Sequence, residues 1–201
     1  YKLSSKVSFE EVELLINTLN EDNTVHGIMV QFPLPSSFQN SKFEILNSIS
    51  PNKDVDGLKD NSKFVHPTAK AVTEIMSLAA NETATEIKTV CVVGASGMVG
   101  RPLVYELKFL GYEVIECDKD TDDLIFKTIN VDCVVSATGT MNLINPDMVK
   151  NEAVLIDVGS PVGDISPLCE EKASFMTPVP GGVGPVTITC LAENLLLSVS
   201  Y

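Results

Sequence analysis

The chain lacks any cluster of basic residues, and this absence narrows its possible partners. Its 14 lysines and arginines are outnumbered by 27 aspartates and glutamates, which gives a net charge of −13. Binding to a phosphate backbone requires concentrated positive charge, so we expect no nucleic-acid partner. The sequence also has no apolar run long enough to cross a bilayer, so we expect no membrane association.

The sequence also lacks the spacing of cysteines and histidines that is typical of a metal site. The five cysteines are scattered, odd in number and form no C-x-x-C pair, and the two histidines, His26 and His66, are isolated. Free, buried thiols in a reducing cytoplasm are the simplest interpretation, so we predict a cytoplasmic protein without a metal site.

Hydrophobic residues make up 44% of the 201 residues, which is enough for a substantial core. Ser8, with Glu11 three positions later, predicts an N-cap for a helix over 9–19. A buried strand is expected at 25–32. The spacing of apolar residues further predicts helices at 43–49, 67–80, 98–110 and 186–199, and strands at 89–93, 113–117, 131–137 and 154–158.

Buried strands that alternate with helices indicate an α/β fold with a parallel sheet covered on both faces. The polar stretch 81–85 separates this alternating series from the region before it. We therefore place a domain boundary there, with a first domain over 1–83 and a second over 84–183.

A glycine-rich turn lies at the start of the second series, where CVVGASGMVGRP (91–102) has the pattern strand, turn, helix. Glycines let a pyrophosphate approach the backbone, and the helix N-terminus supplies N–H donors and partial positive charge. The spacing is G-x-x-G-x-x-G and no Lys-Ser/Thr pair follows, which disfavours a Walker-type site. The context favours dinucleotide binding over a purely structural turn.

Acidic residues follow the next strand, and Asp118 is among them. A carboxylate there can bind a ribose 2′-hydroxyl and repel a 2′-phosphate, whereas the neighbouring Lys119 favours the opposite preference. A solvated loop without any ligand contact is the alternative.

Three further segments stand out. Gln31 ends the expected strand 25–32, and its amide could bind a heterocycle or be satisfied in the core. KDVDG (53–57) concentrates charge in a turn, and a purely structural turn is one explanation. TPVPGGVGP (177–185) contains three prolines and three glycines, which specify one unusual backbone path that a flat ligand could lie against. An ordinary turn into the last helix is the alternative.

Together these motifs resemble one known family. VHGIMVQFPLP (25–35), PNKDVDG (51–57), GASGMVGRP (94–102), IDVG (156–159) and TPVPGGVGP (177–185) follow the order seen in the bifunctional methylenetetrahydrofolate dehydrogenase/methenyltetrahydrofolate cyclohydrolase (FolD) family. The resemblance covers nearly the whole chain. It implies a Rossmann-type nucleotide domain and an α/β catalytic domain with a cleft between them, a homodimer, and a last segment (184–201) that returns to the catalytic domain.

The resemblance also implies an activity and its residues. The enzyme would oxidise 5,10-methylenetetrahydrofolate to the methenyl form with NADP, or with NAD, and hydrolyse the product to 10-formyltetrahydrofolate, in the one-carbon metabolism that feeds purine biosynthesis. Gln31 would assist the catalytic lysine and Asp56 would hold the pterin. The implied folate-binding residues are Val30, Gln31, Phe32, Pro33, Asp56, Pro180, Gly181 and Gly182. The implied cofactor-binding residues are Gly94, Ala95, Ser96, Val99, Asp118, Thr138, Gly139 and Ser160.

The sequence departs from the family pattern at several points, and two of them bear on the activity and the cofactor. The family's catalytic Tyr-x-x-x-Lys would precede Tyr1, so either the sequence is part of a longer protein, as we expect, or its cyclohydrolase activity is weak or absent. Ala95 stands where many members have an arginine that pairs with the 2′-phosphate, which leaves the choice between NAD and NADP open.

Overall fold

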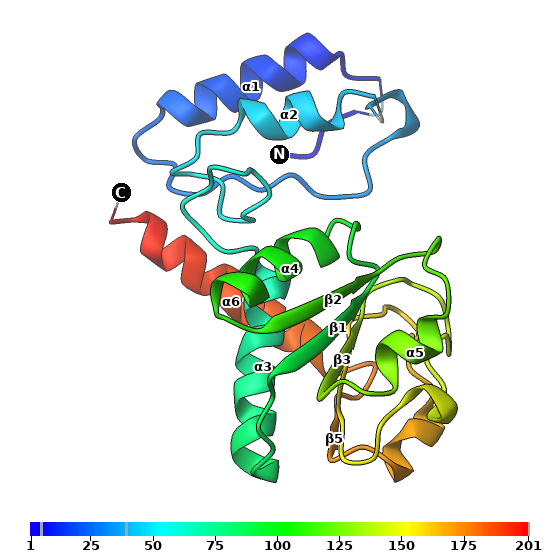
Figure 1. Ribbon diagram of the computed structural model, residues 1–201. Coiled ribbons are helices and arrows are strands. Elements are labelled where there is room, and N and C mark those ends of the chain that lie inside the picture. The colour runs from blue at the N-terminus through cyan, green and yellow to red at the C-terminus, as the bar shows by residue number, and fades with distance from the viewer. Residues whose placement is uncertain (5, 39, 201) are drawn as a thin grey trace. The chain divides into compact units, whose positions relative to one another are not determined.

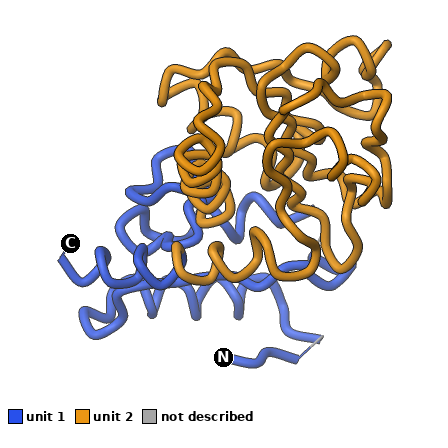
Figure 2. The backbone as a smooth tube through the Cα atoms, turned by 90° about the horizontal axis from the view of Figure 1, so that it is seen from below, with its two compact units in different colours: residues 1–66, 191–201 blue, residues 67–190 orange. Residues whose placement is uncertain are grey.

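The computed structural model describes residues 1–4, 6–38 and 40–200, and the chain divides into two compact units (Figures 1 and 2). Unit 1 contains residues 1–66 and 191–201, and unit 2 contains residues 67–190. The boundary expected at residues 83 and 84 thus lies before α3 (Pro67–Thr83). The reason is tertiary packing, because α3 buries Val72 and Met76 in the core of unit 2.

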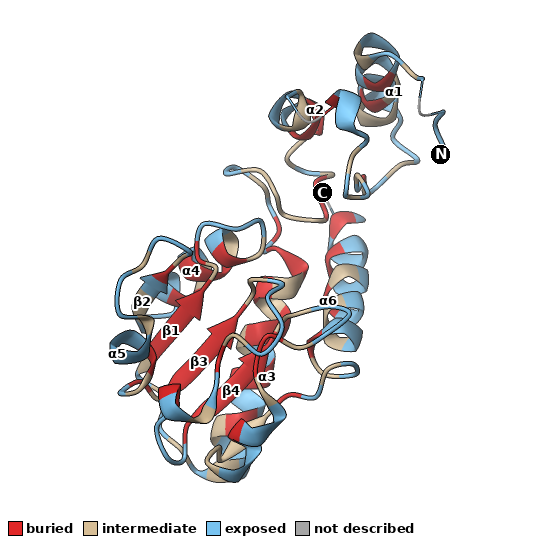
Figure 3. Cartoon of the chain, turned by 90° about the vertical axis from the view of Figure 1, so that its right-hand side faces the viewer, coloured by how far each residue is buried: buried red, intermediate tan, exposed pale blue. Residues whose placement is uncertain are grey.

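Unit 2 is built on a five-stranded parallel sheet in the order β2-β1-β3-β4-β5. This confirms the predicted α/β fold. The order reverses direction at β1, from which β2 lies on one side and β3 on the other (Figure 3). The strands are β1 (Thr89–Val93), β2 (Glu113–Cys117), β3 (Cys133–Ser136), β4 (Val154–Asp157) and β5 (Phe175–Met176).

Both faces of this sheet are covered, as the apolar strands predict. Val90 and Val92 of β1 join a core with α3 and α4 (Gly100–Phe109), whereas Cys91 and Val93 join a second core on the other face. Side chains alternate across a strand, so continuous apolar strands supply both cores. The second face carries α5 (Leu124–Thr128), η2 (Pro146–Met148) and η3 (Pro167–Glu171).

Unit 1 contains α1 (Phe9–Glu21), η1 (Ser36–Phe38) and α2 (Lys42–Ser48). The predicted capping box is confirmed: the Ser8 hydroxyl accepts a hydrogen bond from Glu11 N at 3.2 Å, and Glu11 Oε2 accepts one from Ser8 N at 2.8 Å. The strand expected at 25–32 is wrong, because only Ile28 forms a bridge, with Asp54. A strand requires a ladder of neighbours, and one pair does not make a ladder.

The last helix, α6 (Val183–Ser198), begins in unit 2 and ends in unit 1. Asn194 ties its end to unit 1, since Asn194 Nδ2 donates to the carbonyl oxygens of Val55 and Val65, both at 2.9 Å. The return to unit 1 therefore begins at Leu191 in the structure, where residue 184 was expected. Across the described residues, no helix combines the length and apolar character that a bilayer crossing needs.

Candidate active site

The glycine turn between β1 and α4 leaves no space for side chains at two positions. A Cβ atom added to Gly94, whose φ is 89°, would lie 2.6 Å from the carbonyl oxygen of Ala137. One added to Gly100 would lie 2.0 Å from the carbonyl oxygen of Gly94. The backbone of the turn is thus packed closely before the N-terminus of α4, where a helix offers positive partial charge to a phosphate. This arrangement fits the pyrophosphate of a dinucleotide.

Ala95 and Val99 lie in the same turn and also have structural roles there. The methyl group of Ala95 is buried in the core, and its N–H donates to the Cys117 carbonyl at 3.1 Å. Val99 immediately precedes α4, and its carbonyl accepts a hydrogen bond from Leu103 N at 3.1 Å. Both residues therefore shape the turn.

Ser96 and Asp118 are bonded to each other. The carboxylate of Asp118 accepts hydrogen bonds from Ser96 N, at 3.1 and 3.2 Å to its two oxygens, and from Ser96 Oγ at 2.9 Å. Ser96 follows β1 and Asp118 follows β2, so the parallel pairing of these strands brings them together. A negative charge thus stands beside the glycine turn, where the adenosine ribose of a dinucleotide binds in this fold.

Thr138, Gly139 and Ser160 lie at the same carboxyl edge of the sheet, in the loops after β3 and β4. A Cβ added to Gly94 would be 3.3 Å from Cγ2 of Thr138, so the loop after β3 packs against the glycine turn. Ligands of open parallel sheets bind along this edge, next to the point where the strand order reverses. The expected cofactor residues are therefore gathered along one edge of unit 2.

The segment Pro178–Gly182 lies in unit 2, between β5 and α6. Gly181 has a φ of 107°, which favours glycine, and Gly182 N donates to the Pro178 carbonyl at 2.9 Å. Pro180 and Gly181 are exposed. The segment presents a closed turn of backbone to solvent, a surface that a flat ring can lie against.

In unit 1, the first two residues of the KDVDG segment, Lys53 and Asp54, are hydrogen-bonded within the unit. Lys53 Nζ donates to the carbonyl oxygens of Leu19, Asn20 and Asp22 at 2.9, 2.7 and 2.8 Å, and so caps the C-terminal end of α1. Asp54 is buried and accepts a hydrogen bond from Lys59 N at 3.0 Å. These two residues hold the segment in place.

Asp56 is the partly buried acid of that segment. Burial, followed by the negative charge of Asp54, raises the pKa of Asp56 to about 6. Functional carboxylates commonly have such shifted pKa values, although structural ones do as well. At neutral pH the group is mostly ionised and can accept two hydrogen bonds from one ligand.

Gln31 is exposed, and its Nε2 donates to the carbonyl oxygen of Phe32 at 3.0 Å. Its neighbours Val30 and Phe32 pack against the core of unit 1, whereas Pro33 is exposed. Lys42 Nζ lies over the Phe32 ring, 4.8 Å from the ring centroid, in a cation–π contact. The Gln31 amide therefore faces solvent, and its carbonyl oxygen has acceptor capacity for a ligand.

Sequence reasoning overlooked two buried acids at the carboxyl edge, Asp157 and Asp164. Asp157 ends β4, and Asp164 Oδ2 accepts hydrogen bonds from Thr138 N and Gly139 N. An acid directly after an apolar strand run was the available signal.

Two family models match nearly the whole chain. The NAD(P)-binding domain of tetrahydrofolate dehydrogenase/cyclohydrolase matches residues 66–201, and the catalytic domain of the same enzymes matches residues 1–56. The chain belongs to the tetrahydrofolate dehydrogenase/cyclohydrolase family. It is 39% identical over 216 residues to the bifunctional protein FolD of Campylobacter jejuni, across 98% of this chain and 75% of the relative. The FolD protein of Paraburkholderia phytofirmans is 38% identical, across 92% of this chain and 70% of the relative.

Solved structures of the family agree with the fold. The crystal structure of the Campylobacter jejuni FolD enzyme aligns with a TM-score of 0.91 at 38% identity, across 100% of this chain and 76% of that one. The Trypanosoma brucei FolD enzyme, complexed with NADP cofactor and inhibitor, aligns with a TM-score of 0.87 at 32% identity, across 98% of this chain and 74% of that one. The predicted family and its NAD(P)-binding domain are thereby confirmed.

Proposed function

We propose that this chain oxidises 5,10-methylenetetrahydrofolate to 5,10-methenyltetrahydrofolate with a nicotinamide dinucleotide. The main support is that the two family domains match residues 1–56 and 66–201, with names that state a dehydrogenase and cyclohydrolase activity on tetrahydrofolate. The Campylobacter jejuni relative is named bifunctional protein FolD, and this chain covers 75% of its length. The alternatives, another Rossmann dehydrogenase or a non-catalytic dinucleotide-binding module, leave the match of residues 1–56 unexplained.

The dinucleotide would lie along the carboxyl edge of the sheet in unit 2. The turn from Gly94 to Val99 would hold the pyrophosphate, Ser96 and Asp118 the adenosine ribose, and the loops of Thr138, Gly139 and Ser160 the nicotinamide end. When bound, the nicotinamide supplies the hydride acceptor, and the chain's residues align it with the folate.

The choice between NADP and NAD would depend on Ser96 and Asp118. NADP is the cofactor of the Trypanosoma relative. In this chain the donors of Ser96 are engaged by a carboxylate, which would repel a 2′-phosphate and could accept a hydrogen bond from a 2′-hydroxyl. We therefore expect NAD to compete with NADP. A preference for NADP above about a hundredfold, roughly 2.7 kcal/mol, would contradict this role of Asp118.

The folate contacts that we propose follow the family resemblance. Asp56 would accept hydrogen bonds from the amino-pyrimidine edge of the pterin, a role that its ionised form at neutral pH permits. Val30, Gln31, Phe32 and Pro33 would contact the ring system, and Pro180, Gly181 and Gly182 would supply a backbone surface. Hydrolysis to 10-formyltetrahydrofolate needs proton transfer, in which Gln31 would assist the family's catalytic lysine. We propose this second step for a protein that carries that lysine.

The test is a spectrophotometric assay of the full-length protein with methylenetetrahydrofolate and either NAD or NADP. We expect reduced cofactor to form. Asp56→Ala should abolish folate binding and leave the cofactor dissociation constant within about twofold, because Asp56 and the cofactor residues belong to different units. Glu13→Ala, which removes an exposed carboxylate of unit 1, is the matched control and should keep both affinities.

Two outcomes would overturn the proposal. Cofactor binding without turnover would favour the non-catalytic module, and turnover of another substrate class would favour a different dehydrogenase. Intact folate affinity in Asp56→Ala would refute the role of that residue. We further propose a cytoplasmic homodimer that serves purine biosynthesis, and light scattering of the purified protein would test the dimer.

A further inference from the structure

Two buried carboxylates, Asp157 and Asp164, join three loops at the carboxyl edge of unit 2. Asp157 is 2% exposed and Asp164 is 0% exposed. Asp164 N donates to Asp157 Oδ1 at 3.1 Å, so the two residues form one network. Buried carboxylates are costly unless their oxygens receive hydrogen bonds, so the donors around them show what the network holds.

Asp164 Oδ2 receives four donors from the end of β3 and the loop that follows it. Ser136 Oγ donates at 2.9 Å, Thr138 N at 2.6 Å, Thr138 Oγ1 at 2.9 Å and Gly139 N at 3.2 Å. Hydrogen bonds to an ionised acceptor are shorter and stronger than neutral ones. One carboxylate oxygen therefore sets the path of the loop that carries Thr138 and Gly139.

The position of this loop matters for the glycine turn on its other side. The carbonyl oxygen of Ala137 would be 2.6 Å from a Cβ atom at Gly94, so loop and turn are in close contact. A displacement of the loop after β3 would either press into the turn or open a gap beside it.

Asp157 extends the same network to the remaining loops. Its Oδ1 accepts from Gly159 N at 2.8 Å and its Oδ2 accepts from Ile165 N at 2.8 Å, which holds the loop that contains Ser160. Asp157 N donates to Thr177 Oγ1 at 2.8 Å, directly before the Pro178–Gly182 turn. The expected nicotinamide loops and the expected folate surface of unit 2 are thus connected by two acids.

We infer that Asp164 is a positioning residue for the nicotinamide end of the cofactor, acting through Thr138 and Gly139, and that Asp157 holds Asp164 in place. This inference rests on the proposed function, because it deepens the account of the same site. Asp164 itself needs no contact with the cofactor.

Asp164→Asn is a sharp test because the second oxygen, Oδ1, is buried without a hydrogen-bond partner among the described residues. A Cβ at Gly159 would be 2.7 Å from Asp164 Oδ1, 2.8 Å from the Val162 carbonyl oxygen and 2.9 Å from Asp157 Oδ1, so acceptors converge there. Since Oδ1 receives no hydrogen bond from the described residues, an asparagine amide nitrogen at that position would displace no donor. The fold should therefore tolerate the variant, while the loop loses its carboxyl acceptor and keeps only a weaker amide oxygen.

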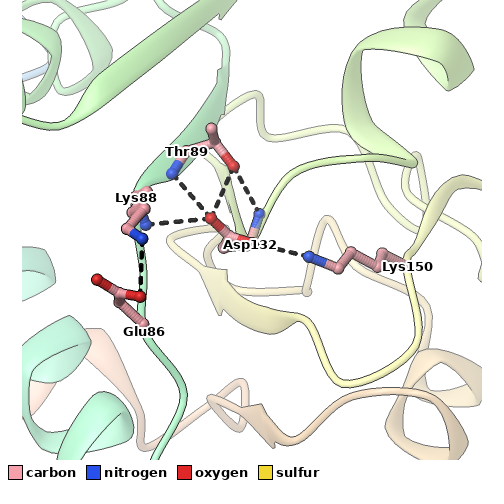
Figure 4. Close-up of polar contacts among 5 residues, drawn as sticks. All are labelled: Glu86, Lys88, Thr89, Asp132 and Lys150. Atoms are coloured by element: carbon pink, nitrogen blue, oxygen red, sulfur yellow. Dashed lines mark hydrogen bonds and ion pairs between the residues drawn. The ribbon is translucent and has the colours of Figure 1, made fainter.

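Asp132 provides a matched control at the opposite end of β3 (Figure 4). Its carboxylate accepts hydrogen bonds from Lys88 N at 3.1 Å, Thr89 N at 3.0 Å and Thr89 Oγ1 at 2.9 Å, and pairs with Lys150 Nζ at 2.7 Å. This acid thus resembles Asp164 in its bonding but precedes β3, away from the carboxyl edge. Asp132→Asn should lower thermal stability without a change in cofactor kinetics.

The experiment measures three quantities on the full-length protein: kcat/KM for the dinucleotide, its affinity from the fluorescence of the reduced nicotinamide, and the affinity for ADP-ribose, which lacks the nicotinamide. For Asp164→Asn we expect kcat/KM to fall at least about tenfold, which corresponds to about 1.4 kcal/mol, with weaker binding of the reduced dinucleotide. ADP-ribose affinity should fall less than the affinity for the reduced dinucleotide, because the weakened hydrogen bonds hold Thr138 and Gly139 directly and the Gly94 turn only through that loop. Ser136→Ala, which removes one donor, should cause a smaller loss in the same direction.

Other results would overturn the inference, the proposed activity or both. Dinucleotide kinetics and fluorescence that match the wild type in Asp164→Asn would refute the positioning role, even if the wild-type protein is active. An equal loss of ADP-ribose affinity would indicate a general collapse of the edge. A wild-type protein that binds the dinucleotide but does not turn over would refute the proposed activity alone, because the fluorescence comparison still tests Asp164. Failure of the wild type to bind either ligand would refute both.

Discussion

Replacing His66 by glutamine should change how the stability of unit 1 responds to pH. His66 is 7% exposed, and burial lowers its pKa from 6.5 to about 4. Asp56 has the opposite shift, because burial and then Asp54 raise its pKa from 3.8 to about 6. The two residues belong to the same unit, so both contribute to its unfolding equilibrium.

The signs of the two contributions differ. Between pH 6.5 and 4 the folded state keeps His66 neutral, while the unfolded chain takes up a proton at this residue. The stabilisation of the folded state by neutral His66 is therefore fully present above pH 6.5 and is lost as the pH falls to 4. Its size is about 3 kcal/mol, at 1.36 kcal/mol per pKa unit. Asp56 stabilises the folded state below pH 3.8, and this contribution is lost as the pH rises through 6. Because Asp56 is partly exposed, we reduce its contribution to about 2 kcal/mol.

In the wild type these two contributions oppose each other between pH 4 and 6.5 and leave a net rise in stability of about 1 kcal/mol with pH. His66→Gln should leave only the contribution of Asp56, so its free energy of unfolding should fall by about 2 kcal/mol as the pH rises across this range. Asp56→Asn should show the reverse, a rise of about 3 kcal/mol.

Urea denaturation at several pH values, followed by hydrogen exchange of the α1 amides, reports on unit 1. His26→Gln is the matched control, because the His26 side chain is exposed. A pH profile of His66→Gln parallel to that of the wild type would show that burial does not keep the imidazole neutral.

Two further predictions concern single contacts. Asp118→Ser frees both donors of Ser96 and should shift the ratio of kcat/KM toward NADP by at least about tenfold, measured by steady-state kinetics with each cofactor. An unchanged ratio, or an equal shift in the control Asp120→Ser, would contradict the assignment. Lys53→Met removes the ammonium group from the C-terminal end of α1 and should destabilise unit 1 by about 2 kcal/mol in urea denaturation. A loss no larger than that of Lys63→Met, which alters an exposed lysine, would show that this cap contributes little.

Local signals in the sequence predicted most elements of unit 2. The strands at Thr89–Val93 and Glu113–Cys117 have the predicted bounds, and the capping box of Ser8 and Glu11 has the predicted partners. In these cases the physical cause lies within a few residues, as with a helix cap or a short apolar run between turns. The strand predicted at 25–32 was wrong because its cause is not local. Its apolar residues favour a strand, but strand pairing depends on distant neighbours.

The candidate site shows the same contrast between features with local causes and features that depend on tertiary structure. The spacing of Gly94, Gly97 and Gly100 indicated a phosphate turn, and the structure adds that the Ala137 carbonyl forbids a side chain at Gly94. Asp118 and Ser96 were proposed as separate contacts, and only the pairing of β1 with β2 shows that they bond to each other. The sequence shows Lys53 only as a charge in a turn. The structure shows that it binds three carbonyl oxygens, more than 30 residues earlier, at the end of α1.

The sequence by itself indicated the parallel α/β fold, because glycine geometry, proline restriction and apolar periodicity act over short stretches of chain. It indicated the family through the resemblance of its motifs and their order. Tertiary structure alone decided that α3 packs with unit 2 and that Asp164 gathers Ser136, Thr138 and Gly139. The physical reason is that a buried carboxylate draws its donors from loops 25 to 28 residues away, and only the order of the strands brings those loops to one edge.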